Sequence, residues 1–450
     1  MSVRDAFAFL AGKAVLAGMK AFGKSGYHIP GMVAYRISPT VLRYIHKPAR
    51  TVVISGTNGK STTTALVQQV LRASGLKVAY NTESNTQPGV VAGLLRYTSF
   101  FNRSKADVLV LEVGEEALSK IVPILRPQYL LLTNVQKDVP QVNQSPNYIR
   151  EKIASVITDD MTLLVNNDDP DVSSIGAKWQ RAHTYGIGHN RYSQAPDTSR
   201  FAITRPCPIC SGKLVFDYLN LPGVGRFRCT KCGFSSTERP DYLAEDFDLD
   251  AGTITIGGRA YPMHYKAAHF AYNYVLAYAF AKQLGIADDT IAKAFDAFVN
   301  IQGRLEEFSA AGKTVHYTRF KQETADTLAL GIEVVRRDPR PKTVIIALNV
   351  VENAWGPKYA NTFYGFDVDF SRLAGPEANV QKFVCLGSTV AYDTANILRY
   401  AGIPREKIVV LETDDSAKIA DVVRDAETSE VYLLAWLHHF QEIRKAMSHE

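Results

Sequence analysis

Short apolar runs alternate with longer amphipathic segments from residue 51 onward. TVVIS opens this alternation, and LKVAY, ADVLVLEVG, PQYLLLTNV and MTLLVNN continue it. Apolar runs of strand length, each separated from the next by a segment of helical periodicity, are typical of a mostly parallel sheet with helices on both faces. The pattern therefore predicts an α/β fold.

The same alternation returns in the last third of the chain. The runs KTVIIALNV, QKFVCLG, KIVVLET and EVYLLAW follow the helical pattern HFAYNYVLAYAFAKQLG and the junction GRLEEF. We expect a central domain over 51–305 and a C-terminal Rossmann-like α/β domain over 310–450, with a boundary near 305–315. Residues 1–50 are expected to be helical, and the Pro-, Gly- and Cys-rich stretch 200–240 is expected to be an insertion in the central domain.

The N-terminal segment MSVRDAFAFLAGKAVLAGMKAFGKSG is apolar but repeatedly interrupted by charge. Its charged residues are Arg4, Asp5, Lys13, Lys20 and Lys24, and no cleavage site of small residues follows a long apolar core. The segment predicts an amphipathic helix, not a signal peptide or a transmembrane span. We expect it to pack on its own domain in a cytoplasmic protein, with peripheral contact at the inner face of the membrane as the alternative.

Composition adds little to this picture. Of the 450 residues 46% are hydrophobic and 21% are charged, which is the balance of a folded protein. Lys and Arg exceed Asp and Glu by 51 to 45, so the net charge is only +6. This mild excess fits an anionic substrate and does not indicate nucleic acid.

The segment GTNGKST stands between a predicted strand and a predicted helix. Gly56 and Gly59 allow the main chain to curl so that successive N–H groups face phosphate oxygens, and the helix N-terminus adds partial positive charge. Lys60 supplies a point charge to the terminal phosphates, and Ser61, or its neighbour Thr62, offers a hydroxyl to Mg²⁺. We predict a catalytic role for Lys60 and an ATP-binding loop made of Gly56, Thr57, Asn58, Gly59, Lys60, Ser61 and Thr62.

A carboxylate is needed beside this loop to hold Mg²⁺. Glu112 ends the apolar strand pattern VLVLE, and open α/β sheets place their ligands at the carboxyl ends of strands. Glu112 is therefore predicted to be a catalytic residue and to form the magnesium site together with Ser61. Glu115 and Glu116 are expected to be solvated acids at the start of the next helix.

Four of the five cysteines form two CxxC pairs. Cys207 and Cys210 are separated from Cys229 and Cys232 by a spacing that is typical of a structural zinc ribbon. Four sulfur ligands leave no open position for catalysis, so we expect a structural or docking role. The fifth cysteine, Cys385, lies in the apolar run FVCLG and is expected to be buried.

Taken together, these segments resemble the MurT family of the Mur ligase superfamily. The resemblance extends over nearly the whole chain and includes FLAGK, HIPGMVA, GTNGKST, LEVGEEAL, LLTNV, VNNDDP, the four-cysteine insertion, GRLEEF, DVDF and LRYAGIP. GTNGKST alone identifies only the superfamily. The cysteine insertion and the C-terminal pattern narrow the resemblance to MurT.

The resemblance implies an amidating ligase that uses ATP, Mg²⁺ and structural Zn²⁺. MurT-like proteins phosphorylate the α-carboxylate of D-glutamate in a lipid-linked or soluble cell-wall peptide precursor. Ammonia from a GatD-like glutaminase, the partner in a heterodimer, then displaces the phosphate. The resemblance further implies that Asn273 lies near the adenine and that Arg304 approaches the nucleotide. The mild charge and the residues around the cysteines indicate no nucleic-acid partner.

The C-terminal domain departs from the family pattern where chemistry is expected. Alignment on DVDF places Asn361 at the position of the family's catalytic aspartate, and a neutral amide cannot act as a base. Glu352 and Asp367 are the nearest candidates to replace it. Two alternatives therefore stay open: a divergent ligase that adds an amino acid to another cell-wall peptide, and a non-catalytic ATP-binding scaffold.

Overall fold

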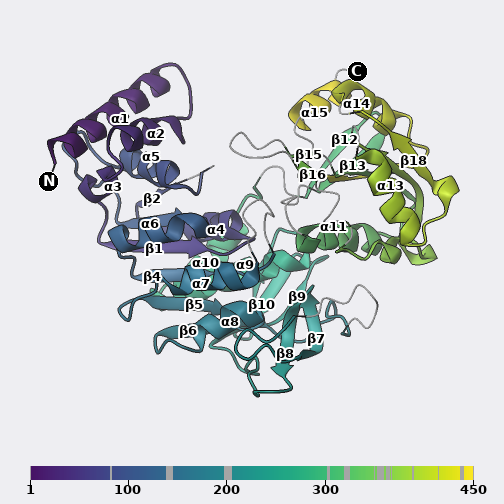
Figure 1. Ribbon diagram of the computed structural model, residues 1–450, viewed down its shortest axis with the longest axis horizontal. Helices are drawn as coiled ribbons and strands as arrows, with labels where there is room; N and C mark the ends of the chain where they lie inside the picture. The colour runs from purple at the N-terminus through teal and green to yellow at the C-terminus, as the bar shows by residue number, and fades with distance from the viewer. Residues whose placement is uncertain are drawn as a thin grey trace. The chain divides into compact units, whose positions relative to one another are not determined.

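The protein is described from a computed structural model (Figure 1). The described residues are 2–448 except 82–83, 138–144, 197–204, 302–304, 319–324, 349, 352–358, 361–364, 366, 388–389, 414 and 436–439. They form two compact units. The first is built from residues within Met1–Gln136, Ser145–Pro196 and Thr204–Val299, and the second from Lys137 and residues within Asn300–Glu450.

A nine-stranded sheet forms the centre of the first unit, in the order β11-β10-β9-β6-β5-β4-β1-β3-β2. The strands from β2 to β9 in this order run parallel, and β10 and β11 are antiparallel to their neighbours. Their bounds are β1 Arg50–Ser55, β2 Val78–Tyr80, β3 Val108–Glu112, β4 Tyr129–Leu132, β5 Thr162–Asn166, β6 Ala182–Ile187, β9 Tyr242–Asp248, β10 Thr253–Ile256 and β11 Arg259–Pro262.

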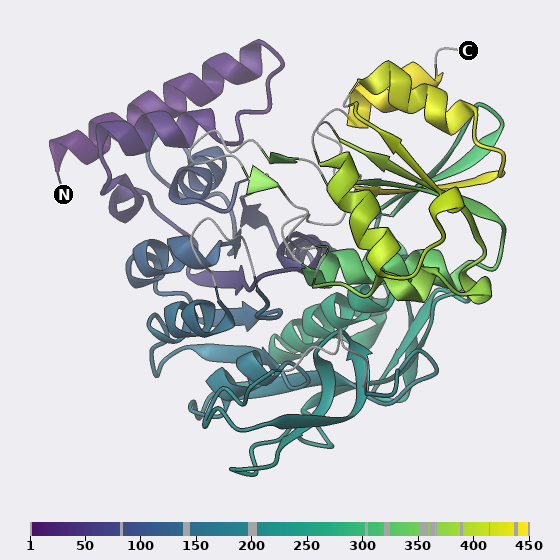
Figure 2. The same ribbon diagram turned by 45° about the vertical axis from the view of Figure 1, so that its right-hand side comes forward.

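Helices cover both faces of this sheet (Figure 1, Figure 2). On one face α4 packs against α9 and α10, and on the other α5, α6, α7 and α8 follow one another in a row. Their bounds are α4 Lys60–Ala73, α5 Gln87–Tyr97, α6 Glu115–Leu125, α7 Pro146–Ala154, α8 Pro170–Gly176, α9 Ala268–Gln283 and α10 Asp288–Asp296. Because both faces are covered, β1, β3 and β4 are buried along nearly their whole length.

Two smaller pieces complete the first unit. Helices α1 (Val3–Ala21), α2 (Ile29–Ile37) and α3 (Val41–Tyr44) precede the sheet. The antiparallel hairpin of β7 (Leu214–Leu221) and β8 (Val224–Cys229) follows β6 and carries cysteines. Among the described residues, none of the helices combines the length and apolar character needed to span a bilayer.

The second unit contains a six-stranded sheet in the order β12-β13-β19-β14-β17-β18, parallel except for β12. Its strands are β12 Glu306–Ala310, β13 Lys313–Thr318, β14 Lys342–Ala347, β17 Val380–Leu386, β18 Ile408–Leu411 and β19 Glu430–Ala435, beside a small pair β15 Val350–Val351 and β16 Tyr359–Ala360. Helices α11 Ala325–Arg337, α13 Ala391–Tyr400, α14 Ser416–Arg424 and α15 Phe440–Ser448 bury apolar side chains on its two faces. The second α/β alternation predicted from the sequence is thus confirmed.

Candidate active site

The loop between β1 and α4 has the curled main chain that a phosphate site requires. Gly56 and Gly59 have φ values of 122° and 82°, in the region that favours glycine. A Cβ on Gly56 would overlap the Thr133 hydroxyl, and one on Gly59 would overlap the Asn273 amide nitrogen. Both glycines are therefore required by conformation and by close contact, and the loop leads directly into the N-terminus of α4.

Lys60 is the first residue of α4, and its side chain folds back over the loop. The ammonium group donates hydrogen bonds to the main-chain oxygens of Gly56 and Thr57, the latter at 3.0 Å. Its Nζ also lies 3.4 Å from Oε1 of Glu115. The positive charge is therefore held at the loop, although the side chain is only 6% exposed.

Glu115 is the acid that sequence reasoning misjudged. We expected a solvated carboxylate at the start of α6, but Glu115 is 6% exposed and faces Lys60. Its position at the first turn of α6 directs it toward the N-terminus of α4, and only Glu116 is exposed as expected. No feature of the local pattern distinguishes the two adjacent glutamates.

Glu112 ends β3, directly beside the strand that leads into the loop. It is paired in register with Ile54 of β1, and it is half-buried. The Asn81 side chain accepts a hydrogen bond from the Glu112 N–H and donates one to its carbonyl, at 2.8 and 2.7 Å. Glu112 therefore has a fixed main chain and a side chain that reaches solvent.

The two candidate hydroxyls of α4 differ in accessibility. Ser61 is half-buried, whereas Thr62 is 0% exposed. A cation ligand must be reachable from the phosphate side of the loop, so the structure favours Ser61 over Thr62. The accessible hydroxyl of Ser61 and the carboxylate of Glu112 are hard oxygen donors of the kind that Mg²⁺ prefers.

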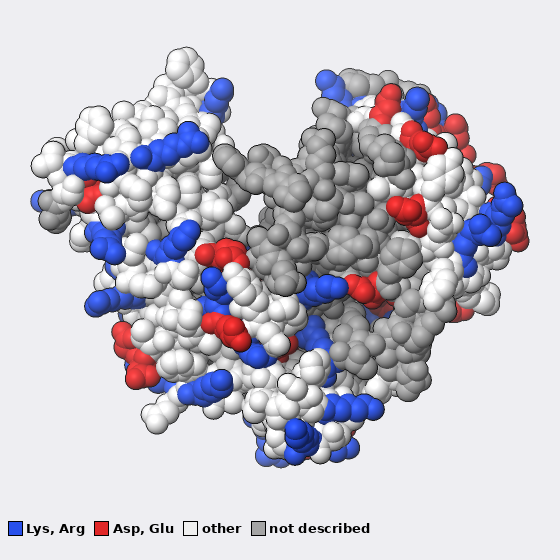
Figure 3. Space-filling model, viewed as in Figure 1, with Lys and Arg blue, Asp and Glu red and all other residues white. Residues whose placement is uncertain are grey.

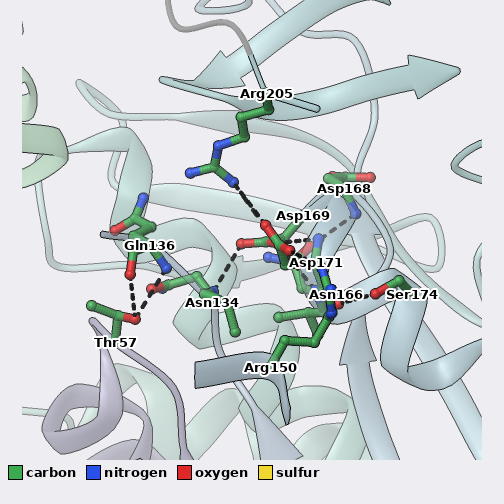
Figure 4. Close-up of polar contacts among 12 residues, drawn as sticks. Thr57, Asn134, Gln136, Arg150, Asn166, Asp168, Asp169, Asp171, Ser174 and Arg205 are labelled. Carbon is green, nitrogen blue, oxygen red and sulfur yellow. Dashed lines mark hydrogen bonds and ion pairs between the residues drawn. The ribbon is translucent and has the colours of Figure 1, made fainter. Parts of the chain in front are cut away.

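A second segment, Thr133–Gln136 after β4, braces the phosphate loop. The Thr57 N–H donates to the Asn134 carbonyl at 2.8 Å, and the Asn58 N–H donates to Oδ1 of Asn134 at 2.9 Å. Thr57 Oγ1 accepts the Gln136 N–H at 3.0 Å (Figure 4). These bonds fix the loop from the β4 side before any nucleotide arrives.

Asp169 supports the same segment from behind. Its Oδ2 accepts the Val135 N–H at 3.0 Å, and its Oδ1 caps α8 by accepting the N–H groups of Asp171 and Val172. Arg205 lies on its other side, with Nη1 4.0 Å from Oδ1 of Asp169 (Figure 4). Burial raises the pKa of Asp169 to about 6, and the Arg205 charge opposes that rise.

Asp168 is buried next to Asp169 and is hydrogen-bonded to three further elements. Its Oδ2 accepts the Ile187 N–H and the Tyr272 hydroxyl, each at 2.8 Å, and its main-chain oxygen accepts the Gly225 N–H at the start of β8. Burial raises the pKa of Asp168 to about 6 despite these hydrogen bonds. Sequence reasoning used VNNDDP only as a resemblance and missed this supporting layer, although adjacent acids directly after an apolar strand were a visible signal.

Asn273 is buried within α9 and contacts the phosphate loop directly. Its Nδ2 donates to the Gly59 carbonyl at 3.3 Å and to Thr63 Oγ1 at 2.9 Å. At 5% exposed it is a buried amide and does not lie on the solvent-facing surface of the helix. An adenine contact, which the resemblance implies, stays a prediction.

Several predicted residues fall outside the described part of the chain. Arg304, Asn361 and Glu352 all lie there, so their places relative to the loop stay predictions. Asp367 is described and exposed.

The four paired cysteines converge at one end of the β7–β8 hairpin. Their sulfur atoms all lie within 4.8 Å of one another, with Cys207 and Cys232 3.7 Å apart and Cys210 and Cys229 3.6 Å apart. Four sulfurs at about 2.3 Å from a tetrahedral zinc would be separated by about 3.8 Å, so the arrangement fits that ion and is too wide for disulfides. N–H groups of Cys232 and Lys231 point at Cys229 Sγ and lower the pKa of that thiol to about 6.

Comparisons with known proteins agree with this geometry. The Mur ligase middle domain matches residues 54–223, and the MurT ligase C-terminal domain matches residues 326–436. The MurT subunit of lipid II isoglutaminyl synthase from Staphylococcus aureus (strain N315) is 27% identical over 360 residues, which is 79% of each chain. The MurT subunit from Streptococcus pneumoniae (strain ATCC BAA-255 / R6) is 25% identical and covers 100% of this chain and 98% of its own.

Solved structures show the same fold at lower identity. A pseudomurein peptide ligase type C from Methanothermus fervidus has a TM-score of 0.69 at 19% identity, over 90% of this chain and 80% of that one. MurF from Thermotoga maritima in complex with ADP has a TM-score of 0.60 at 14% identity, over 93% and 84% of the two chains. Fold, phosphate loop and both domain matches define an ATP-dependent ligase of the Mur type. Within that superfamily the chain is similar to MurT proteins, and residues 326–436 match the MurT ligase C-terminal domain.

Proposed function

We propose that the protein activates the α-carboxylate of the D-glutamate in lipid II for amidation. A carboxylate oxygen attacks the γ-phosphorus of ATP, and ADP leaves. Ammonia then attacks the acyl carbon of the resulting acyl phosphate, phosphate departs with the bridging oxygen, and an amide forms. The observation that carries this proposal is the intact phosphate loop, which is hydrogen-bonded to Asn134 and Gln136 and holds Lys60 at its centre.

The residues of the loop have separate roles in this reaction. The N–H groups from Gly56 to Thr62 receive the phosphates, and Lys60 exchanges its loop carbonyls for phosphate oxygens as negative charge accumulates. Ser61 and Glu112 would hold Mg²⁺, which would supply positive charge between the nucleotide and the carboxylate. Asn273 positions the loop, and Arg304 is assigned to the nucleotide on the resemblance.

The ammonia is supplied by a GatD-like glutaminase in a heterodimer. Four of the five cysteines are committed to the sulfur cluster, which leaves Cys385. Cys385 is 0% exposed, as the sequence predicted, and burial raises the pKa of its thiol to about 12. A buried, protonated thiol cannot attack glutamine, so glutamine hydrolysis belongs to a partner.

We also propose that the four cysteines hold a structural Zn²⁺. A closed four-sulfur site fastens the hairpin end without offering an open coordination position. The other end of the hairpin bonds to Asp168 through Gly225 and to β6 through Asn220. The metal therefore stabilises a hairpin that packs on the layer behind the phosphate loop.

Product analysis tests the proposal directly. Purified protein is incubated with ATP, Mg²⁺, ammonium and lipid II, and amidated product is measured by mass spectrometry alongside phosphate release. We expect amide formation, and expect glutamine to replace ammonium only when a GatD-like subunit is added. ATP turnover without any amidated product would contradict the amidation step.

Asn361, at the position of the family's catalytic aspartate, supports one alternative nucleophile. In this alternative the protein joins an amino acid, in place of ammonia, to a cell-wall peptide. The same mass-spectrometric assay with mixed amino acids in place of ammonium separates the two, because each gives a different mass increase. If neither nucleophile is incorporated and ATP is bound without turnover, the protein is an ATP-binding scaffold.

A further inference from the structure

One exposed stripe of α1 carries no charged residue along its length, and the exposed Arg4 and Lys20 lie beside it. Positions that alternate in steps of four and three residues form this exposed stripe: Val3, Phe7, Leu10, Ala14, Ala17 and Ala21. Val3 is 88% exposed, Phe7 63% and Leu10 50%. A surface helix normally presents charged and polar residues to water, so this face is unusual.

The stripe is separate from the face that α1 uses for folding. Ala8, Phe9, Gly12 and Leu16 are buried on the opposite side, where α1 packs against α2, α3 and α5. The apolar residues of the stripe therefore contribute nothing to the described core. Nineteen residues of helix make the stripe about 28 Å long.

An aromatic loop extends the same surface. Phe101 is 87% exposed and Phe100 57%, in the turn that follows α5. The Lys13 ammonium lies 5.0 Å from the Phe100 ring centroid and donates to the Leu95 and Thr98 carbonyls. Lys13 is buried and follows Leu10 by one helical turn, so this contact holds the Phe100 ring against α1, one turn from an exposed residue of the stripe. Phe22, 84% exposed, lies just beyond the C-terminal end of α1.

The charged residues of the N-terminal helices are almost all positive, and Arg4, Lys20 and Lys24 among them are exposed on or just after α1. The first 50 residues contain one acid, Asp5, which is buried and accepts hydrogen bonds from Ser38 and Thr40. Figure 3 shows basic side chains on a largely uncharged surface over the N-terminal helices. The basic residues of this segment are Arg4, Lys13, Lys20, Lys24, Arg36, Arg43, Lys47 and Arg50.

We propose that the stripe of α1 and the Phe100–Phe101 turn form a docking surface for an anionic lipid bilayer. An interfacial helix places apolar and aromatic residues at the acyl boundary and Lys or Arg at the headgroups, which is the arrangement found here. A protein partner would need no basic border, so the charge favours lipid over a second copy of the chain. Only the role of this surface rests on the proposed function: it holds the enzyme where a lipid-linked substrate lies.

Vesicle flotation tests the surface independently of catalysis. The full-length protein is mixed with vesicles of phosphatidylcholine alone or of phosphatidylcholine with phosphatidylglycerol, and the bound fraction is measured. Wild type is expected to float with the anionic vesicles and to be released by high salt. The triple variant Phe7→Gln/Leu10→Gln/Phe101→Ser is expected to bind at least about tenfold more weakly, since each removed apolar side chain contributes to insertion.

Matched variants separate this effect from loss of folding. Val299→Gln and Tyr400→Ser alter equally exposed apolar residues in other segments and should float like wild type. ATP binding should be unchanged in the triple variant, so a loss of vesicle binding can be distinguished from a loss of ligase function. Equal flotation of wild type and triple variant, or no flotation of wild type, would overturn the proposal. A wild-type dimer that the triple variant abolishes would assign the surface to a second copy instead.

Discussion

The side-chain amide of Asn273 donates a hydrogen bond to the carbonyl oxygen of Gly59 across 214 positions of sequence. The same nitrogen bonds Thr63 Oγ1 at 2.9 Å. Helix α9, from the end of the first unit, thus fixes the junction between the phosphate loop and α4. The curl of the loop depends on this contact as well as on its glycines.

Removing this amide should weaken nucleotide binding more than it weakens the fold. Asn273→Ala is expected to reduce MgATP affinity by about 5- to 30-fold, because an unsatisfied buried partner costs about 1–2 kcal/mol. Asn273→Asp should be worse, since it adds negative charge behind the phosphates. Calorimetric titration measures both. Gln283→Ala, at the far end of α9 where the side chain bonds Tyr242, is the control and should bind MgATP normally.

Substitutions of Glu112 and of Glu115 should have different effects on the magnesium dependence of ATP turnover. Glu112→Gln is expected to raise the Mg²⁺ concentration needed for half-maximal ATP turnover by about tenfold, through loss of a carboxylate ligand. Glu115→Gln should leave that concentration unchanged, because Glu115 faces Lys60 at 3.4 Å. Turnover is measured across a magnesium titration, with Glu116→Gln on the same helix as control. The opposite pattern would assign the metal to Glu115.

Asp168 should give stability a pH dependence between about pH 4 and 6. Its pKa is raised from 3.8 to about 6 in the folded protein, so the native state binds more protons than the unfolded state in this window. The contribution of Asp168 to stability therefore falls as pH rises, by at most about 3 kcal/mol. Relative to wild type, Asp168→Asn should be least stable near pH 4 and recover toward pH 7.

Thermal or urea unfolding across that range measures the difference between the two proteins. Asp160→Asn is the control. The Thr158 hydroxyl lowers the pKa of Asp160, so any effect of Asp160 on the pH dependence of stability lies below pH 4. A difference between wild type and Asp168→Asn that stays flat from pH 4 to 7 would show that Asp168 is not held protonated by burial.

Loss of any one cluster cysteine should remove zinc and loosen the hairpin. Cys210→Ser is expected to lower bound zinc from one ion per chain to near zero and to reduce the melting temperature. Elemental analysis and calorimetry measure the two effects. Cys385→Ala, in the core of the second unit, should keep its zinc even where it lowers stability. Wild-type protein isolated without zinc, and unable to take it up, would end this assignment.

The sequence predicted the elements better than the contacts between them. Apolar runs and GTNGKST indicated both parallel sheets and the loop, because periodicity and glycine placement are local properties. The partners of that loop are not local: Asn134 and Asn273 reach it from two other segments, and Asp169 holds the segment that carries Asn134. Glu115 shows the same limit, since only the packing of α6 beside α4 makes a helix-start acid a buried neighbour of Lys60.

Calorimetric titration of wild type and Lys60→Ala with ATP in the presence of Mg²⁺ tests the central claim most directly. Lys60 occupies the loop and is expected to pair with the terminal phosphates, so wild type should bind one ATP per chain. The variant should fold normally and bind at least about tenfold more weakly, since it lacks a charge-assisted bond. Absence of ATP binding by wild type, or equal affinity in both proteins, would contradict a phosphate site at this loop.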